Sequence, residues 1–182
     1  GATTGTASFT PINDTVFEAN ETAIVSISSV TGADATENGI QSETITIVKD
    51  ADAAPTVTLA TSATSIAENA GSSLTLTATL SNATNEDVTV GISTSGTGTE
   101  GTDYSTISDI TISAGSTTGT ASFTPTDDNV FEGNETGVVA ISTVSGGSAT
   151  ESGSQSVTIT ISENESAPTV TLSTSATSIA EN

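Results

Sequence analysis

An internal repeat of about 113 residues constrains this chain more than any other feature. Residues 5–11 (GTASFTP) recur as residues 119–125, and residues 54–59 (APTVTL) recur as residues 167–172. A period of this length corresponds to a whole domain, not to one turn of a solenoid. The sequence therefore predicts a window cut across a tandem array. Residues 1–53 are expected to be the C-terminal half of one repeat, 54–166 a complete repeat, and 167–182 the first strand of the next.

The two partial repeats predict the kind of partner that this chain needs. Half of a sheet-containing domain exposes unpaired strand edges and apolar faces, which folded proteins avoid. We therefore expect neighbouring repeats of the same chain, or identical chains in a filament, to complete them.

The complete repeat is predicted to be an all-β, Ig-like sandwich. Apolar residues alternate with Thr and Ser in seven short segments, and no segment has the period of a helix. Seven such strands in a repeat of this length are typical of two packed antiparallel sheets, with an aliphatic inner face and a hydroxyl-rich outer face. The predicted strands span residues 56–66, 74–80, 88–92, 110–112, 120–123, 138–141 and 157–161.

The charge of the chain excludes several classes of function. It has 22 acidic residues, one basic residue (Lys49) and a formal net charge of −21. Nucleic acids and anionic membranes are therefore not expected as partners, because both are bound through clustered Lys and Arg. A disordered acidic chain is the alternative to a fold, but the strict alternation of β-branched residues favours strands. The composition is typical of bacterial surface proteins and predicts an extracellular location.

An enzymatic function is not expected. The chain has no His and no Cys, and Lys49 is its only basic side chain. Paired carboxylates could serve a glycosidase, but one Tyr and four Phe cannot line a sugar-binding cleft.

Nearly all acidic residues lie in loops rather than in strands. Because alternate strands of a sandwich run in opposite directions, the loops after the first, third, fifth and seventh strands are expected to meet at one pole. Clustered carboxylates repel one another, and a hard cation such as Ca²⁺ removes that repulsion by binding their oxygens. Zinc, copper and iron–sulfur sites are not expected without His or Cys. The charge pattern alone leaves open both a calcium site and a solvated acidic rim. The acidic groups are Glu68, then Glu100 with Asp103, then those in residues 127–135, then Glu163 with Glu165.

Three motifs in order resemble the Calx-beta domain, a calcium-binding module of sodium–calcium exchangers and of large bacterial surface proteins. They are residues 66–71 (IAENAG), 101–104 (GTDY) and 127–135 (DDNVFEGNE). The resemblance implies a seven-stranded sandwich with a calcium cluster at one pole. By position it implies Glu68, Asp103, Asp127, Asp128, Glu132 and Glu135 as side-chain ligands and Val130 as a carbonyl ligand.

Two further sets of ligands follow from the same resemblance. Glu163 and Glu165 stand where the family has consecutive Asp residues. The first partial repeat has Asn13 where the complete repeat has Asp127, so its site is expected to be weaker or to hold fewer ions. Its implied ligands are Asp14, Glu18, Glu21, Asp50 and Asp52.

The preferred hypothesis is a structural, calcium-binding repeat of a bacterial adhesin or surface filament, in which Ca²⁺ rigidifies the junctions between repeats. Two alternatives stay open. One is a calcium-responsive binding or sensor module, which needs only one or two copies. The other is a calcium-independent acidic spacer, whose charge serves hydration alone.

Overall fold

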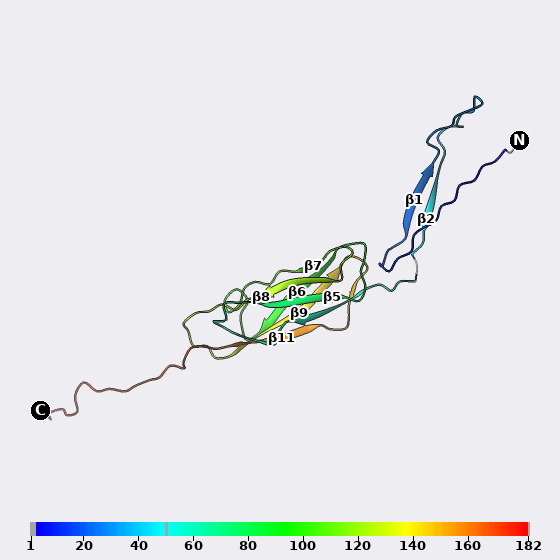
Figure 1. The fold of residues 1–182 in the computed structure, drawn as a ribbon. Coiled ribbons are helices and arrows are strands. Elements are labelled where there is room, and N and C mark those ends of the chain that lie inside the picture. Colours follow the sequence, from blue (N-terminus) through cyan, green and yellow to red (C-terminus); the bar gives the residue numbers. More distant parts are fainter. Residues whose placement is uncertain (1–2, 50, 182) are drawn as a thin grey trace.

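The computed structural model describes residues 3–49 and 51–181, and their regular structure consists of strands (Figure 1). Nine strands lie between residues 56 and 162, and two strands precede them. The described residues contain no helix that could cross a membrane. In chain order the strands are β1 (Glu21–Ser26), β2 (Ser42–Ile47), β3 (Thr56–Thr61), β4 (Ser65–Ala67), β5 (Leu74–Leu80), β6 (Val88–Gly96), β7 (Ile110–Ile112), β8 (Thr118–Phe123), β9 (Glu135–Ser145), β10 (Thr150–Glu151) and β11 (Ser156–Ser162).

Two sheets form the sandwich. One has the strand order β10-β3-β5-β8, and the other has the order β4-β11-β9-β6-β7. The inward residues of each strand are aliphatic and buried, as in β5, where Leu76, Ala78 and Leu80 alternate with Thr77 and Thr79. The predicted sandwich is thus confirmed, with its apolar faces packed between the sheets and Thr on the outside.

A pair of aromatic rings fills the core near one end of the sandwich. Tyr104 and Phe123 stack with their ring centroids 4.6 Å apart, and both are almost fully buried. Gly137 on β9 makes room for them, because a Cβ atom there would lie 2.7 Å from the Phe123 ring. This close approach requires glycine at that position.

The structure departs from the expected antiparallel pattern at two sheet edges. The first predicted strand, residues 56–66, is interrupted: β3 pairs in one sheet, and β4 pairs parallel to β11 in the other. The additional short strand β10 pairs parallel to β3. The interruption has a local cause. Residues 62–64 carry the chain from the end of β3, in the four-stranded sheet, to the edge of the five-stranded sheet, where β4 pairs with β11.

Residues 3–49 reproduce only part of the complete repeat. Strands β1 and β2 form an antiparallel hairpin and correspond in sequence to β9 and β11. Residues 4–9 have the same sequence as β8, yet they form no strand, and Phe9 is 46% exposed. Residues 167–181 likewise form no strand. In the complete repeat the counterparts of these two segments, β8 and β3, both pair with β5, whereas no strand among the described residues pairs with the two segments themselves. The repeat boundaries stay predictions.

Residues 4–9 and 118–123 have the same sequence, so they offer a matched test of the core. Phe123→Ala should destabilise residues 54–166 by about 3–5 kcal/mol, because it empties a fully buried aromatic position. The identical change at the exposed Phe9 should cost less than about 0.5 kcal/mol. Guanidinium unfolding followed by the near-UV circular dichroism of Tyr104 measures both. Equal losses would contradict the assignment of the core.

Candidate metal centre

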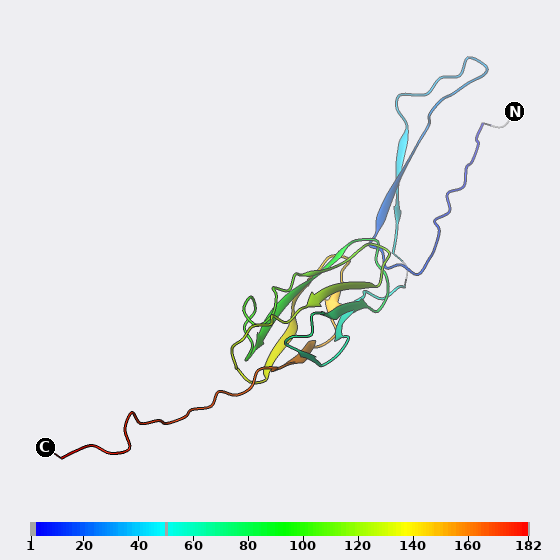
Figure 2. The ribbon, with the colours of Figure 1, turned by 60° about the vertical axis from the view of Figure 1, so that its left-hand side comes forward.

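Residues 167–181 leave the sandwich at one of its ends (Figures 1 and 2). Four loops bring acidic side chains together at this end. The parallel pairing of β4 with β11 sets Ala67 opposite Ser162, so both strands end together. The Glu68 amide then donates to the Ser162 carbonyl at 3.0 Å. Asp103 enters from the loop between β6 and β7, and residues 127–135 enter between β8 and β9. We call Glu68, Asp103, Asp128, Glu132, Glu135, Glu163 and Glu165 the acidic pole.

The acidic pole contains three groups of carboxylates whose oxygens lie within 4.8 Å of one another. Glu68 belongs to two of the groups, and Glu132 also belongs to two, so the groups are linked in a row. Oxygens bound to one calcium ion have such separations, because each lies about 2.3–2.6 Å from the ion. The groups are Glu68–Glu163–Glu165, Glu68–Asp128–Glu132 and Asp103–Glu132–Glu135.

Glu163 organises the pole through its carboxylate. Its Oε2 atom accepts the amides of Glu132 at 2.6 Å and Gly133 at 2.8 Å. Its Oε1 atom accepts the amides of Asn164 and Glu165, both at 2.9 Å. The amides of Glu165, Glu132 and Gly133 lower the pKa of Glu163 to about 2. The end of β11 is thereby tied to the loop between β8 and β9.

The surrounding carboxylates have the opposite shift. The pKa of Glu68 is raised mainly by burial, since this side chain is only 8% exposed. Desolvation, followed by the charge of Asp103, raises the pKa of Glu132 and of Glu135. Contact with the Glu163 carboxylate raises the pKa of Glu165. These four neighbouring acids are therefore harder to ionise in the ion-free protein, and a cation bound among them would favour their ionised forms.

Two of the predicted ligands and one other acid stand apart from these groups. Asp127 belongs to none of them, although its charge raises the pKa of Glu68 and of Glu165. Val130 lies in the same exposed loop, and its amide donates to Asp128 Oδ1 at 2.7 Å. Glu100 binds the protein itself, because its two oxygens accept Thr94 Oγ1 and the Ile107 amide.

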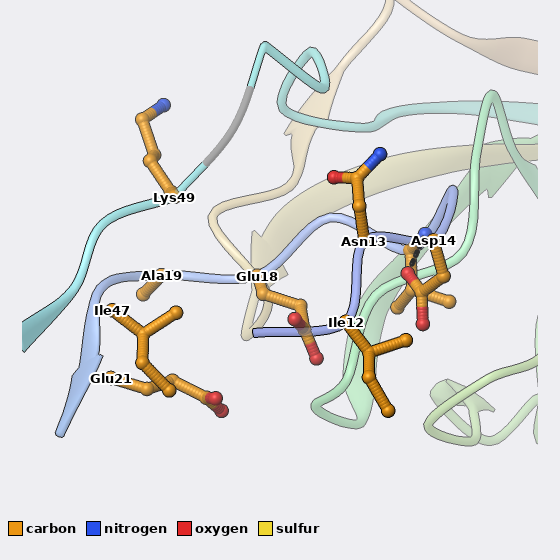
Figure 3. A pocket seen from close by; sticks show the side chains of 9 residues that line it. Ile12, Asn13, Asp14, Glu18, Ala19, Glu21, Ile47 and Lys49 are labelled. Atoms are coloured by element: carbon orange, nitrogen blue, oxygen red, sulfur yellow. Dashed lines mark hydrogen bonds between the residues drawn. The ribbon is translucent and has the colours of Figure 1, made fainter. Parts of the chain in front are cut away.

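The ligands predicted in the first partial repeat lie farther from one another than those of the acidic pole. Asp14, Glu18 and Glu21 line a small cavity together with Lys49, whose side chain points away from them (Figure 3). Among the described residues they form no group of three within 4.8 Å. Asp50 lies outside the described residues, and Asp52 is partly buried just before β3.

Lys49 explains part of this difference. The Lys49 amide donates to Asn20 Oδ1 at 2.9 Å, just as the Glu163 amide donates to Asn134 Oδ1 at 3.0 Å. Lys49 thus occupies the structural position of Glu163, which the alignment of the acidic residues had assigned to Asp50. The insertion of one residue before Pro55 hid this correspondence in the sequence.

The loop of the first partial repeat lies at the junction with the complete one. The Asn85 side-chain amide donates to Glu21 Oε1 at 3.5 Å, and the Asn82 side-chain amide donates to the Ala53 carbonyl at 2.9 Å. Both Asn residues belong to the loop between β5 and β6, at the opposite end of the sandwich from the acidic pole. A predicted ligand of one repeat therefore contacts the next repeat directly.

The residues present fit a hard divalent cation. All potential donors at the acidic pole are oxygens, which Ca²⁺ prefers. The Glu165 Oε2 atom is buried and has no hydrogen-bond partner, so it offers a lone pair that the protein does not use. Fold and site together define an all-β sandwich module with an acidic cation-binding pole.

Comparison with known proteins agrees with this description. The family model of the Calx-beta domain matches residues 50–165, which is more than half of the chain. The chain belongs to the Calx-beta domain family.

Two solved structures are similar to this chain. The apo form of the Calx CBD1 domain shares 18% identity and has a TM-score of 0.49, and the match covers 59% of this chain and 97% of that one. CBD12 from CALX1.2 shares 17% identity with a TM-score of 0.49, and the match covers 59% of this chain and 44% of that one. The matched part of this chain spans less than half the length of the CBD12 structure. A comparison with curated proteins finds no match.

The shifted pKa values predict how stability depends on pH in a chelator. Glu68, Glu132, Glu135 and Glu165 hold protons more tightly when folded, so their contribution is present below pH 4.5 and is lost as the pH rises through their folded pKa values. Glu163 acts in the opposite sense, but only between pH 4.5 and about 2. The Tm in chelator should therefore fall as the pH rises above 4.5 through the raised pKa values of these four groups.

Calorimetry with and without Ca²⁺ checks this expectation. The increase in Tm caused by Ca²⁺ should grow with pH over the same range, and Glu68→Gln should flatten the decline seen in chelator. A Tm that rises with pH in chelator would show that the pole is not under electrostatic strain.

Proposed function

We propose that this chain is a structural, calcium-binding repeat module, in which Ca²⁺ at the acidic pole rigidifies the junction with the following repeat. The observation that carries the proposal is the linked row of three carboxylate groups at the end from which the chain leaves the sandwich. Membership of the Calx-beta family supports a calcium-binding module.

The geometry explains how an ion would stiffen the junction. Glu165 belongs to one of the carboxylate groups and lies three residues before Pro168, where the repeated sequence begins again. A cation shared by Glu68, Glu163 and Glu165 would fix the exit of the chain against the end of β4. Cations bound in the other two groups would hold the loops that follow β6 and β8 to the same centre.

Similarity between the two loops favours a structural role over a sensor. In both repeats an Asp carboxylate accepts the amide two residues on: Val16 donates to Asp14 at 2.8 Å, and Val130 donates to Asp128 at 2.7 Å. An array of similarly built junctions suits a stiff connector, whereas a sensor needs one or two copies.

The proposal also covers the location of the module and its binding partners. We place the module outside the cell, in a bacterial adhesin or surface filament, as the acidic composition suggests. Its partners are neighbouring repeats of the same chain or identical chains, and the module carries no catalysis of its own.

Thermal unfolding of the full chain tests calcium binding. Ca²⁺ at about 100 times its Kd should add about 2.7 kcal/mol per site, which raises Tm by on the order of 10 °C for a domain of this size. Glu132→Gln should remove most of this increase, because Glu132 belongs to two carboxylate groups. Equal concentrations of Mg²⁺ and matched ionic strength with NaCl serve as ion controls.

A charge-matched variant separates coordination from general repulsion. Glu43 lies exposed on β2, away from the acidic pole, so Glu43→Gln makes the same change in net charge. It should leave the response to Ca²⁺ unchanged. A response lost equally in both variants, or reproduced by NaCl in the unmodified chain, would favour the solvated acidic spacer instead.

A further inference from the structure

Phe17 joins the first partial repeat to the sandwich that follows it. The side chain is only 6% exposed, although it lies in a loop that is otherwise open to solvent. Its amide donates to the Ala83 carbonyl at 2.8 Å, and its carbonyl accepts the Asn85 amide at 3.4 Å. Phe17 and Thr84 thereby form a one-residue parallel β-bridge. An aromatic side chain and its own backbone are both held by the next repeat.

The receiving surface is shaped by a glycine. Phe17 borders a small cavity together with Thr84, Asn85 and Gly147, and we call residues 83–85 with Gly147 the Phe17 socket. Thr84 is 1% exposed and forms its floor. A Cβ atom at Gly147 would lie 2.5 Å from Thr84 Cγ2, so a larger residue would displace that floor.

Phe131 occupies the same position in the complete repeat that Phe17 occupies in the partial one. The two loops read NDTVFEANE and DDNVFEGNE. In both loops a Val amide donates to an Asp carboxylate and an Asn side chain accepts a backbone amide, as described above. Phe131, however, is 43% exposed. Within the described residues, no backbone hydrogen bond joins Phe131 to a loop equivalent to residues 83–85.

We propose that Phe131 inserts into the Phe17 socket of another copy of this repeat, so that the array is held by an aromatic contact at each junction. The occupied socket within this chain is the direct precedent. The inference rests on the proposed role as a repeat module, but it does not rest on calcium. The Phe131 loop is already held by two backbone hydrogen bonds, which the amides of Glu132 and Gly133 donate to the Glu163 carboxylate.

One difference between the junctions bears on their strength. The Lys49 ammonium lies 5.3 Å from the centre of the Phe17 ring, whereas Glu163 takes the place of Lys49 beside Phe131. A cation over an aromatic face adds attraction. The Phe131 contact should therefore be weaker than the Phe17 contact and should depend more on apolar burial, which salt does not screen.

Fluorine NMR on the full chain tests the contact. The protein is labelled with 4-fluorophenylalanine, which gives one signal for each of its four Phe residues, and the signals are assigned by single Phe→Leu changes. The unlabelled partner is the chain with Phe17→Ala and Phe131→Ala, whose socket is empty and which has no inserting residue. About 1 M NaCl shortens the Debye length to about 3 Å and suppresses repulsion between these acidic chains.

The expected result is a saturable shift of the Phe131 signal towards that of Phe17, while the signals of Phe9 and Phe123 stay in place. The matched control partner carries Phe131→Ala alone, so its socket stays filled. It should bind at least about tenfold more weakly, because a buried aromatic anchor dominates such an interface. A partner with Gly147→Ala added to the empty-socket changes should also lose binding; Ala33 adopts the equivalent positive φ in the first repeat.

Two results would overturn the inference. One is a stationary Phe131 signal with an empty-socket partner whose Tyr104 circular dichroism shows that it is folded. The other is an equal shift with the filled-socket partner. The titration is run in EDTA and in Ca²⁺. A shift in EDTA without a calcium-dependent Tm leaves the contact intact and refutes the calcium role, and the reverse pattern refutes the contact alone.

Discussion

The parallel pairing of β4 with β11 is the constraint on which the acidic pole depends. It draws the end of the first strand away from its own sheet and lays Glu68 beside the end of β11. Without that crossing Glu68 would lie at the edge of the other sheet, and two of the three carboxylate groups would lose a member. Like charges brought this close repel by about 1–4 kcal/mol per pair at effective dielectrics of 80 to 20. The fold therefore maintains a repulsive arrangement that only protons or cations relieve.

Glu163 shows why such an arrangement is stable enough to exist before an ion arrives. Its carboxylate is satisfied by four backbone amides, so it remains ionised while its neighbours resist ionisation. One carboxylate acts as the fixed anion around which the loop between β8 and β9 is built. The remaining carboxylates keep oxygens turned towards the row that a cation would fill. Glu163 thus orders the loop and also belongs to one of the three carboxylate groups.

The sequence predicted much of the fold and of the site. Each of the seven segments with alternating apolar and hydroxyl residues contains a strand, because packing two sheets face to face requires that period. The alternation did not separate β3 from β4, and it missed the short β10. Counting strand ends brought Glu68, Asp103 and Glu163 to one pole. The crossing at residues 62–64 was missed because residues 56–66 were taken as one strand. Ile66 is out of phase with Val57 and Leu59, and this break in the alternation is the signal that marks the crossing. The equivalence of Lys49 with Glu163 was also missed, because the two side chains have opposite charges and their common feature is an amide hydrogen bond to an Asn side chain.

Two duplicated segments show the limit of local sequence most clearly. Residues 118–123 form β8 and bury Phe123, whereas the identical residues 4–9 form no strand. Residues 56–59 lie in β3, whereas the identical residues 169–172 form no strand. The sequence is identical within each pair, whereas the presence of a neighbouring strand differs. Strand formation in this chain is therefore decided by pairing partners, as the context dependence of β-propensity implies.

The same loop carries both the ligands and the aromatic residue that are proposed to act at the junction. Phe131 lies directly beside Glu132 and between Asp128 and Glu135 in sequence. A cation held by the flanking carboxylates would restrict the conformations of the loop that presents the ring. Less conformational entropy would then be lost when the ring inserts, and pre-organisation of this kind strengthens binding without any new contact. The two proposals thus predict coupling: calcium tightens insertion of Phe131, and by linkage insertion tightens calcium binding by the same factor.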